Sequence, residues 1–168
     1  MKRILLSFCF ISAAFFSSNA QNKKAERDSV ALVKFNKAVT AIEAKDFVII
    51  VGSYDAGNGV FETNTDDANF LSYEKEFVFL QGQIITENSY TNKLTVSDYN
   101  QVPDKKGNIK ISMQVRGFFI TAKVEISLRK GSNYADVIIT PTKGSMKRFS
   151  GEVVPTRESK YFKRSGEV

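Results

Sequence analysis

The sequence contains neither histidine nor tryptophan, and its 168 residues include a single cysteine, Cys9. Without histidine there is no His-based catalytic triad, and one cysteine can build neither an intramolecular disulfide nor a zinc site. Acid–base chemistry would fall to Asp, Glu, Lys or Tyr. We therefore predict no catalytic, cofactor-binding or metal-ligating residues, no cofactor, and a binding or structural role in preference to catalysis. The sequence names no reaction and no ligand.

The only long apolar run lies at the start of the chain and is too short to cross a membrane. Lys2 and Arg3 precede the apolar residues 4–16, and the small residues Ser18 and Ala20 follow. A spanning helix needs about 20 apolar residues. This order of charge, apolar run and small residues is typical of a secretory signal. We predict a signal peptide over residues 1–20, cleaved after Ala20, with export to the periplasm or beyond the cell. Cys9 fills a position inside that signal.

Charge gives little indication of a partner once the signal is removed. Loss of the first 20 of 168 residues would leave 148, and loss of Lys2 and Arg3 would take the formal charge from +6 to +4. The remaining basic residues fall mostly in predicted turns and are mixed with Asp and Glu. A nucleic-acid site would gather them on one face between aromatic platforms. We predict no nucleic-acid partner.

The mature chain begins with one amphipathic segment. Apolar residues recur at three- and four-residue spacing with lysines and Glu43 between them, which predicts a helix over roughly residues 27–45. Its apolar stripe requires a partner surface. The helix could therefore cap an open barrel end or lie on one face of a sheet.

After Asp46 the pattern changes to strands. Alternation of apolar and polar residues is clearest over 109–116 and 118–129, as in half-buried antiparallel strands. Runs at 47–51, 60–63, 70–80, 134–140 and 146–154 also read as strands, and 83–87 and 93–99 do so more weakly. Most of these strands are shorter than those of outer-membrane barrels. We expect the chain not to span a membrane.

Together these segments predict one β-rich domain. Turns recur every 8–12 residues or so, which favours an antiparallel meander or barrel. The predicted fold is α+β and mainly β, with an N-terminal helix followed by about eight antiparallel strands in a lipocalin-like arrangement. The domain covers residues 21–155, and residues 156–168 form a polar C-terminal tail.

Such a barrel could hold a ligand or be filled with side chains. A speculative set of cavity-lining residues comprises Phe77, Phe79, Met113, Phe118, Ile120 and Val124. The sequence favours a filled core but leaves a cavity open. The leading hypothesis is a soluble exported module that binds a small apolar ligand or an envelope partner. The alternative is a small hydrolase or isomerase that uses Asp or Glu with Tyr or Lys.

Several segments resemble a known family. The segments are residues 45–49, 69–71, 97–100, 109–115 and 148–153, the last of which reads Arg-Phe-Ser-Gly-Glu-Val. They are similar to an exported Bacteroidetes family known as domain of unknown function 4251. The resemblance covers most of residues 25–155 and implies a lipocalin-like β structure. It implies no catalytic residues, and the Tyr/Phe/Gly-rich middle stretch of the family is not visible around residues 82–92.

Overall fold

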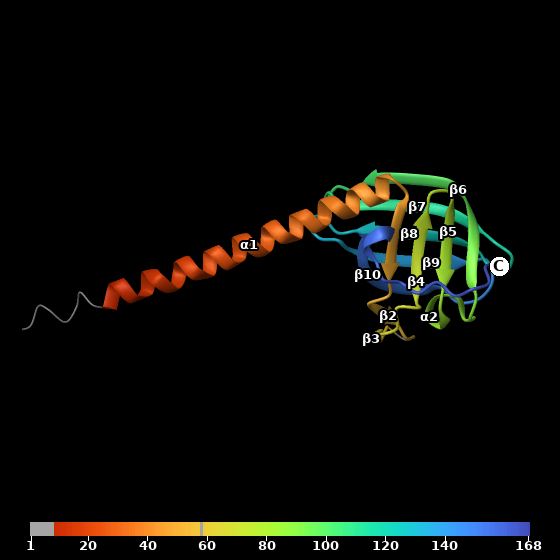
Figure 1. The fold of residues 1–168 in the computed structure, drawn as a ribbon, viewed down its shortest axis with the longest axis horizontal. Helices are drawn as coiled ribbons and strands as arrows, with labels where there is room; N and C mark the ends of the chain where they lie inside the picture. Colours follow the sequence, from red (N-terminus) through yellow and green to blue (C-terminus); the bar gives the residue numbers. More distant parts are fainter. Residues whose placement is uncertain (1–8, 58) are drawn as a thin grey trace, which may run out of the picture.

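The computed structural model describes residues 9–57 and 59–168, with side chains from residue 23 onward. One long helix is followed by strands and two short helical turns (Figure 1). The elements are α1 (Cys9–Glu43), β1 (Asp46–Ile50), β2 (Ser53–Asp55), β3 (Phe61–Thr63), β4 (Phe70–Glu74), β5 (Phe77–Gln81), α2 (Gln83–Thr86), β6 (Thr91–Pro103), β7 (Ile109–Arg116), β8 (Thr121–Leu128), β9 (Tyr134–Pro141), β10 (Lys147–Pro155) and the 3-10 turn η1 (Thr156–Glu158).

Eight of the strands form a closed antiparallel barrel. The order is β1-β4-β5-β6-β7-β8-β9-β10, and β10 pairs back to β1. Each neighbouring pair is antiparallel, so short turns connect most of them. Closure removes the exposed sheet edges that would otherwise pair with other chains. The predicted lipocalin-like, mainly β fold with an N-terminal helix is confirmed.

The barrel closes along a seam on β10, which has two partners on one side. Its first half pairs with β2 through Phe149 and Ser150, and its second half pairs with β1 through residues 153–155. Gly151 lies where the partner changes. The short β2–β3 hairpin extends the sheet beside this seam.

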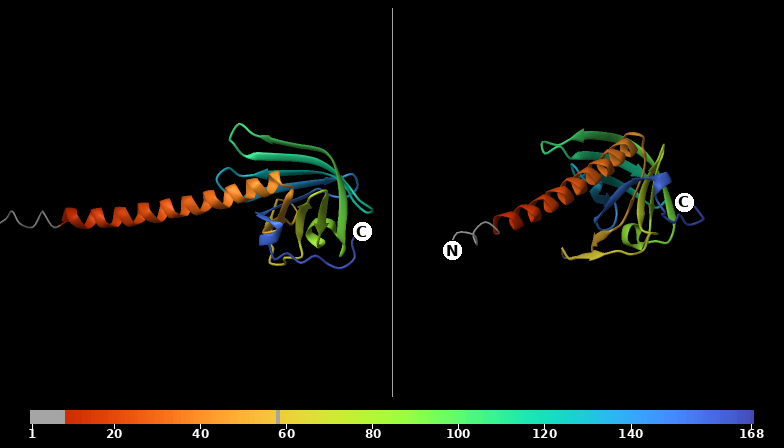
Figure 2. Two further views of the ribbon diagram at one scale, coloured as in Figure 1. Left: turned by 45° about the horizontal axis from the view of Figure 1, so that its top comes forward. Right: turned by 60° about the vertical axis from the view of Figure 1, so that its left-hand side comes forward.

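The last turns of α1 close the end of the barrel at which β1 begins. Ala38 and Ile42 are fully buried and Ala41 nearly so, all within the same cluster as the barrel interior. The apolar stripe predicted from the sequence therefore packs on the barrel end. The preceding part of the helix extends away from the barrel, as Figure 2 shows from two sides. Its residues Val30, Leu32 and Val33 are exposed there.

Side chains fill the interior of the barrel. The inward positions follow the two-residue period of each strand, and on β7 they are Ile111, Met113 and Val115. The equivalent positions on β8 are Ala122, Val124, Ile126 and Leu128. They belong to one continuous hydrophobic cluster. The filled core that the sequence favoured matches this packing.

A second hydrophobic cluster lies on the outer face of the barrel, under the C-terminal residues. It consists of Val48, Phe70 and Phe79, packed against Tyr161 and neighbouring apolar side chains. The Tyr161 ring meets the Phe70 ring edge-on, with 4.8 Å between the ring centroids. Residues 159–168, here called the strap, therefore cover part of β4, β5 and β6. β4 and β5 are consequently buried on both faces.

Four local expectations differ from the structure. In the predicted weak strand 83–87, residues 83–86 form the short helix α2 instead, because Ile85 turns inward and packs against the core. Residues 70–80 are two strands, since Lys75 adopts a left-handed turn conformation. The strand expected from Phe118 starts at Thr121 instead. The helix predicted over 27–45 ends at Glu43 and extends further toward the N-terminus.

Candidate binding site at the open end of the barrel

The barrel end opposite α1 is bordered by three loops. They are the α2–β6 segment, the β7–β8 loop at residues 117–120, and the β9–β10 loop at residues 142–146. The β7–β8 loop can approach β6 closely only because residue 117 is glycine. A Cβ there would lie 2.4 Å from Leu94 Cδ2 and 2.7 Å from the Lys93 carbonyl oxygen. Gly117 thus holds this loop against the barrel wall.

A pocket of about 310 Å³ opens between these loops. Its apolar part is formed by Leu80, Ile85, Ile120 and Ile139, and its rim includes Thr86, Ser145 and Lys147. Ligand pockets in proteins usually range from about 300 to 1,000 Å³ and combine an apolar lining with a few polar groups. The pocket has the size to take a small molecule that carries both apolar and polar groups.

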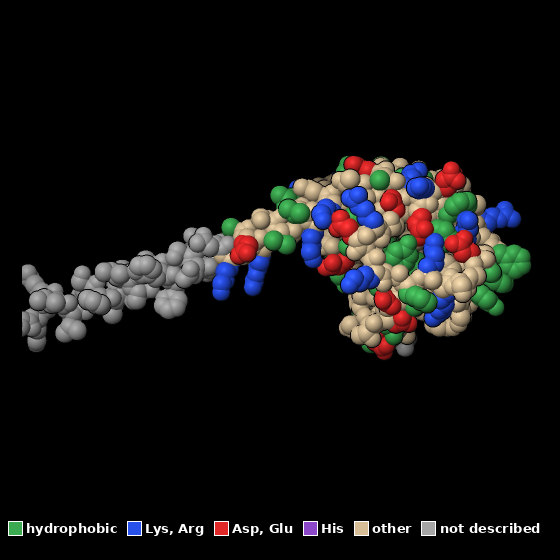
Figure 3. All heavy atoms as spheres, in the orientation of Figure 1, with side chains coloured by type: hydrophobic (Ala, Val, Ile, Leu, Met, Phe, Trp, Pro, Cys, Tyr) green, Lys and Arg blue, Asp and Glu red, His purple; other side chains and the backbone are tan. Residues whose placement is uncertain are grey.

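Aromatic side chains stand exposed beside this pocket. Phe118 is 82% exposed, Phe119 56% and Tyr90 51%. The Tyr90 and Phe119 rings stack with centroids 5.7 Å apart, and the Phe118 ring meets Phe119 edge-on at 4.7 Å. We call Tyr90, Phe118 and Phe119 the aromatic rim. Figure 3 shows hydrophobic side chains gathered at the end of the molecule opposite the helix.

An ion pair borders the pocket on the side of α2. The Lys147 ammonium contacts the Glu87 carboxylate, and Ser145 Oγ lies 3.4 Å from the same carboxylate oxygen. The hydrogen bond from Lys147, followed by its charge, lowers the pKa of Glu87 below its ordinary value. Glu87 is therefore ionised at neutral pH and fixes Lys147 at the pocket edge.

The structure separates the six residues of the speculative cavity set. Met113 and Val124 lie in the packed interior, whereas Phe77 and Phe79 belong to the outer cluster near the strap. Phe118 and Ile120 line the pocket at the open end. The sequence did not single out Phe119 or Ile85. The available signal was three consecutive apolar residues, 118–120, directly after Gly117, which separates the predicted strands 109–116 and 118–129.

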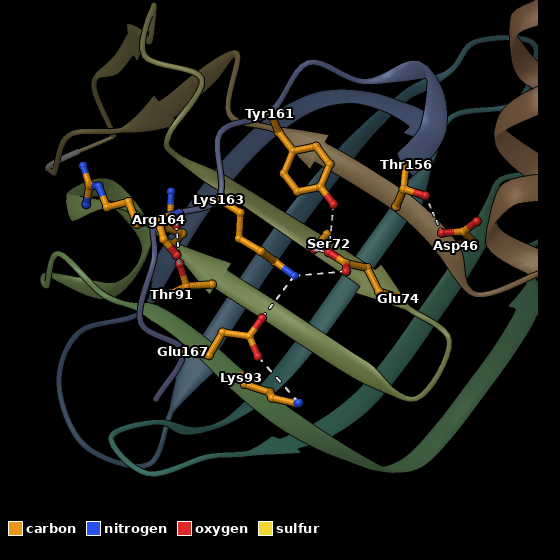
Figure 4. Close-up of polar contacts among 11 residues, drawn as sticks. Asp46, Ser72, Glu74, Thr91, Lys93, Thr156, Tyr161, Lys163, Arg164 and Glu167 are labelled. Carbon is orange, nitrogen blue, oxygen red and sulfur yellow. Dashed lines mark hydrogen bonds and ion pairs between the residues drawn. The ribbon is translucent and has the colours of Figure 1, made fainter.

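The carboxylate cluster that comes nearest to the hydrolase alternative is centred on Glu74, beneath the strap (Figure 4). Its Oε1 accepts hydrogen bonds from the Ser72 hydroxyl (2.7 Å) and the Tyr161 hydroxyl (2.9 Å). Its Oε2 accepts one from Lys163 Nζ (3.0 Å). Burial, and then the bond to Glu74, raise the pKa of Tyr161. All these groups are engaged in holding the strap on the barrel.

In the part of the chain that the structure describes, His, Cys, Asp and Glu side chains form no group of three or more that could hold a metal ion. Among the helices of residues 9–57 and 59–168, none combines the length and the apolar character needed to cross a membrane.

Comparison with known proteins supports the family resemblance. No protein-family model and no curated protein matches this sequence. A solved structure does match, that of a DUF4251 family protein from Bacteroides eggerthii. The two share 27% sequence identity with a TM-score of 0.68, over 79% of this chain and 94% of the other. In fold and in sequence, this chain therefore resembles the domain of unknown function 4251 family, as its segments predicted.

Proposed function

We propose that the protein is an exported binding module that takes a small apolar ligand into the pocket at the open end of the barrel. The observation that carries the proposal is the contrast between the two ends. At one end α1 packs into the core, whereas the other keeps an open pocket with an apolar floor. Barrels of this size with filled interiors leave their mouths and loops for binding.

The pocket also defines what kind of ligand would fit. Ile120 offers aliphatic contact above Leu80 and Ile139, which are almost fully buried, and burial of apolar surface contributes about 25 cal/mol per Å². Lys143 stands at the rim and would favour a ligand with an anionic or polar end, whereas Lys147 is already paired with Glu87. A small amphiphile with an apolar body and an acidic head satisfies both parts of the site.

Export is proposed from the sequence pattern. Basic Lys2 and Arg3, the apolar run and the small residues Ser18 and Ala20 support a cleaved signal. Residues 1–8 lie outside the described residues. Mass spectrometry of protein recovered from the periplasm and the medium tests this part. An N-terminus at Gln21 would support export with cleavage, and full-length protein confined to the cytoplasm would contradict it.

Ligand binding is tested with the fluorescent amphiphile 1-anilinonaphthalene-8-sulfonate, which has an aromatic body and an anionic group. We expect saturable binding that weakens several-fold in Ile120→Ala, because the pocket loses part of its apolar wall. Leu32→Ala is the matched control, since Leu32 is 53% exposed on α1 and does not line this pocket. Equal binding by both variants and the wild type would refute a site in this pocket.

A further inference from the structure

We propose that the aromatic rim docks the protein on an anionic lipid surface. Runs of consecutive exposed apolar residues are unusual on soluble domains unless they serve an interaction. Phe118 and Phe119 occupy an exposed turn, and Phe118 is the most exposed of the large hydrophobic side chains that the structure describes. This proposal concerns the rim and needs no ligand in the pocket.

The rim is held in a defined shape before any partner arrives. Stacking of Tyr90 on Phe119 and the edge-on contact with Phe118 tie two loops together. Gly117 fixes the base of the β7–β8 loop against β6. Binding therefore requires little additional ordering of these side chains, so more of the burial energy remains as affinity.

Charge around the rim selects the lipid surface as its partner. Arg116 directly precedes Gly117 and is exposed, and exposed Lys143 lies on the facing loop. Among the side chains described, over 23–57 and 59–168, neither of these cations has a salt bridge with a carboxylate. Aromatic side chains favour the headgroup region of a bilayer, and nearby Lys or Arg are attracted to anionic lipids. The rim combines both features on one end of the barrel.

The fluorescence of an introduced tryptophan can report this contact specifically, because the protein has no tryptophan of its own. A Phe118→Trp variant places the only indole on the rim. Phe162→Trp is the matched control, since Phe162 is 59% exposed but lies on the strap, along the barrel wall. With vesicles of phosphatidylglycerol and phosphatidylcholine, we expect a blue-shifted emission for Phe118→Trp and quenching by brominated acyl chains. We expect neither for Phe162→Trp. Each introduced indole reports only its own surroundings, so the difference between the two variants can be read whether or not the signal segment is retained.

Sedimentation with the same vesicles gives the affinity. We expect the double variant Phe118→Ser/Phe119→Ser to bind at least about tenfold more weakly, because two phenyl rings no longer leave water. Phe162→Ser should bind like the wild type, and high salt should weaken wild-type binding by screening Arg116 and Lys143.

Three results would overturn the proposal. The first is equal binding to purely zwitterionic vesicles. The second is vesicle binding with no change in the emission of Phe118→Trp. The third is self-association in solution, measured by sedimentation velocity, that the double serine variant abolishes, because the rim would then be an interface between two copies of the chain. Apolar-ligand binding in the pocket is measured without vesicles, so failure of one proposal is distinguishable from failure of the other.

Discussion

The seam that closes the barrel has no room for a side chain at Gly151. A Cβ built there would lie 2.0 Å from the Ile50 carbonyl oxygen and 3.2 Å from Ile49 Cγ2. Gly151 is not among the glycines with a positive φ, so its backbone conformation suits any residue. The effect of a Gly151→Ala substitution is therefore steric, and it falls on the pairing of β1 with β10.

The size of the effect follows from the geometry. Real Cβ atoms essentially never come within 3.0 Å of such an atom, so β1 must move by about 1 Å. Hydrogen bonds along the β1–β10 pairing, which involves residues 47–49 and 153–155, would stretch beyond bonding distance. Overpacking and lost hydrogen bonds together predict a loss of about 3 kcal/mol in the free energy of unfolding.

Urea unfolding followed by far-UV circular dichroism measures this loss. Gly131→Ala is the control, because a Cβ there meets nothing within 4 Å and only its φ of 72° opposes the change. A side chain at such a φ costs about 1 kcal/mol. A Gly151→Ala protein no less stable than Gly131→Ala would refute a steric clash at the seam.

Three other changes test the strap, the half-buried Tyr99 and the helix. Tyr161→Ala should lower the free energy of unfolding by about 2–3 kcal/mol, because the protein loses the Tyr161 ring contact and hydrogen bond. The control Phe162→Ala should change it by no more than about 0.5 kcal/mol, since Phe162 is exposed. Equal losses in the two variants would contradict a packed strap. Burial, together with Tyr73, raises the pKa of Tyr99 from 10.0 to about 12. As the pH rises between these two values, Tyr99 ionises in the unfolded chain before it does so in the folded protein, so the folded state loses stability. Tyr99→Phe should flatten this alkaline decline by about 1 kcal/mol, allowing for partial exposure, and an unchanged pH profile of thermal unfolding would count against it. Ile42→Ala should lower the free energy of unfolding, measured in urea, by about 2–5 kcal/mol because Ile42 is fully buried. The control Leu32→Ala should lower it by about 0.5 kcal/mol or less, because Leu32 is exposed. Comparable losses would argue against docking of the helix on the barrel.

Strands with one solvent face could be predicted from the sequence. On β7 and β8 the alternation of Met113 and Val124 with polar neighbours assigned the inward face correctly, because only one face of each strand is buried. On β5 the same reasoning failed. The strap buries the outer face as well, so apolar Phe77 and Phe79 point outward while Val78 and Leu80 fill the core.

At residues 83–87, local propensity also predicts the wrong secondary structure. The sequence Gln-Ile-Ile-Thr-Glu favours a strand, since β-branched residues lose rotamer freedom in helices. Burial of Ile85 at the barrel end stabilises a helical turn instead, and the Asn69 side chain accepts a hydrogen bond from the Ile84 amide. A contact between residues 15 apart decides the structure, and no local pattern contains it.

The missing histidine and the lone cysteine excluded whole classes of chemistry, and the apolar periodicities established a helix followed by antiparallel strands. These features are local, so amino-acid composition and residue spacing are enough to predict them. The location of the candidate site depended on the tertiary structure. Barrel closure brings α2, the β7–β8 loop and the β9–β10 loop together around one pocket. It also leaves Phe118 in water although its sequence context predicted a core strand, because the chain turns there before the strand begins.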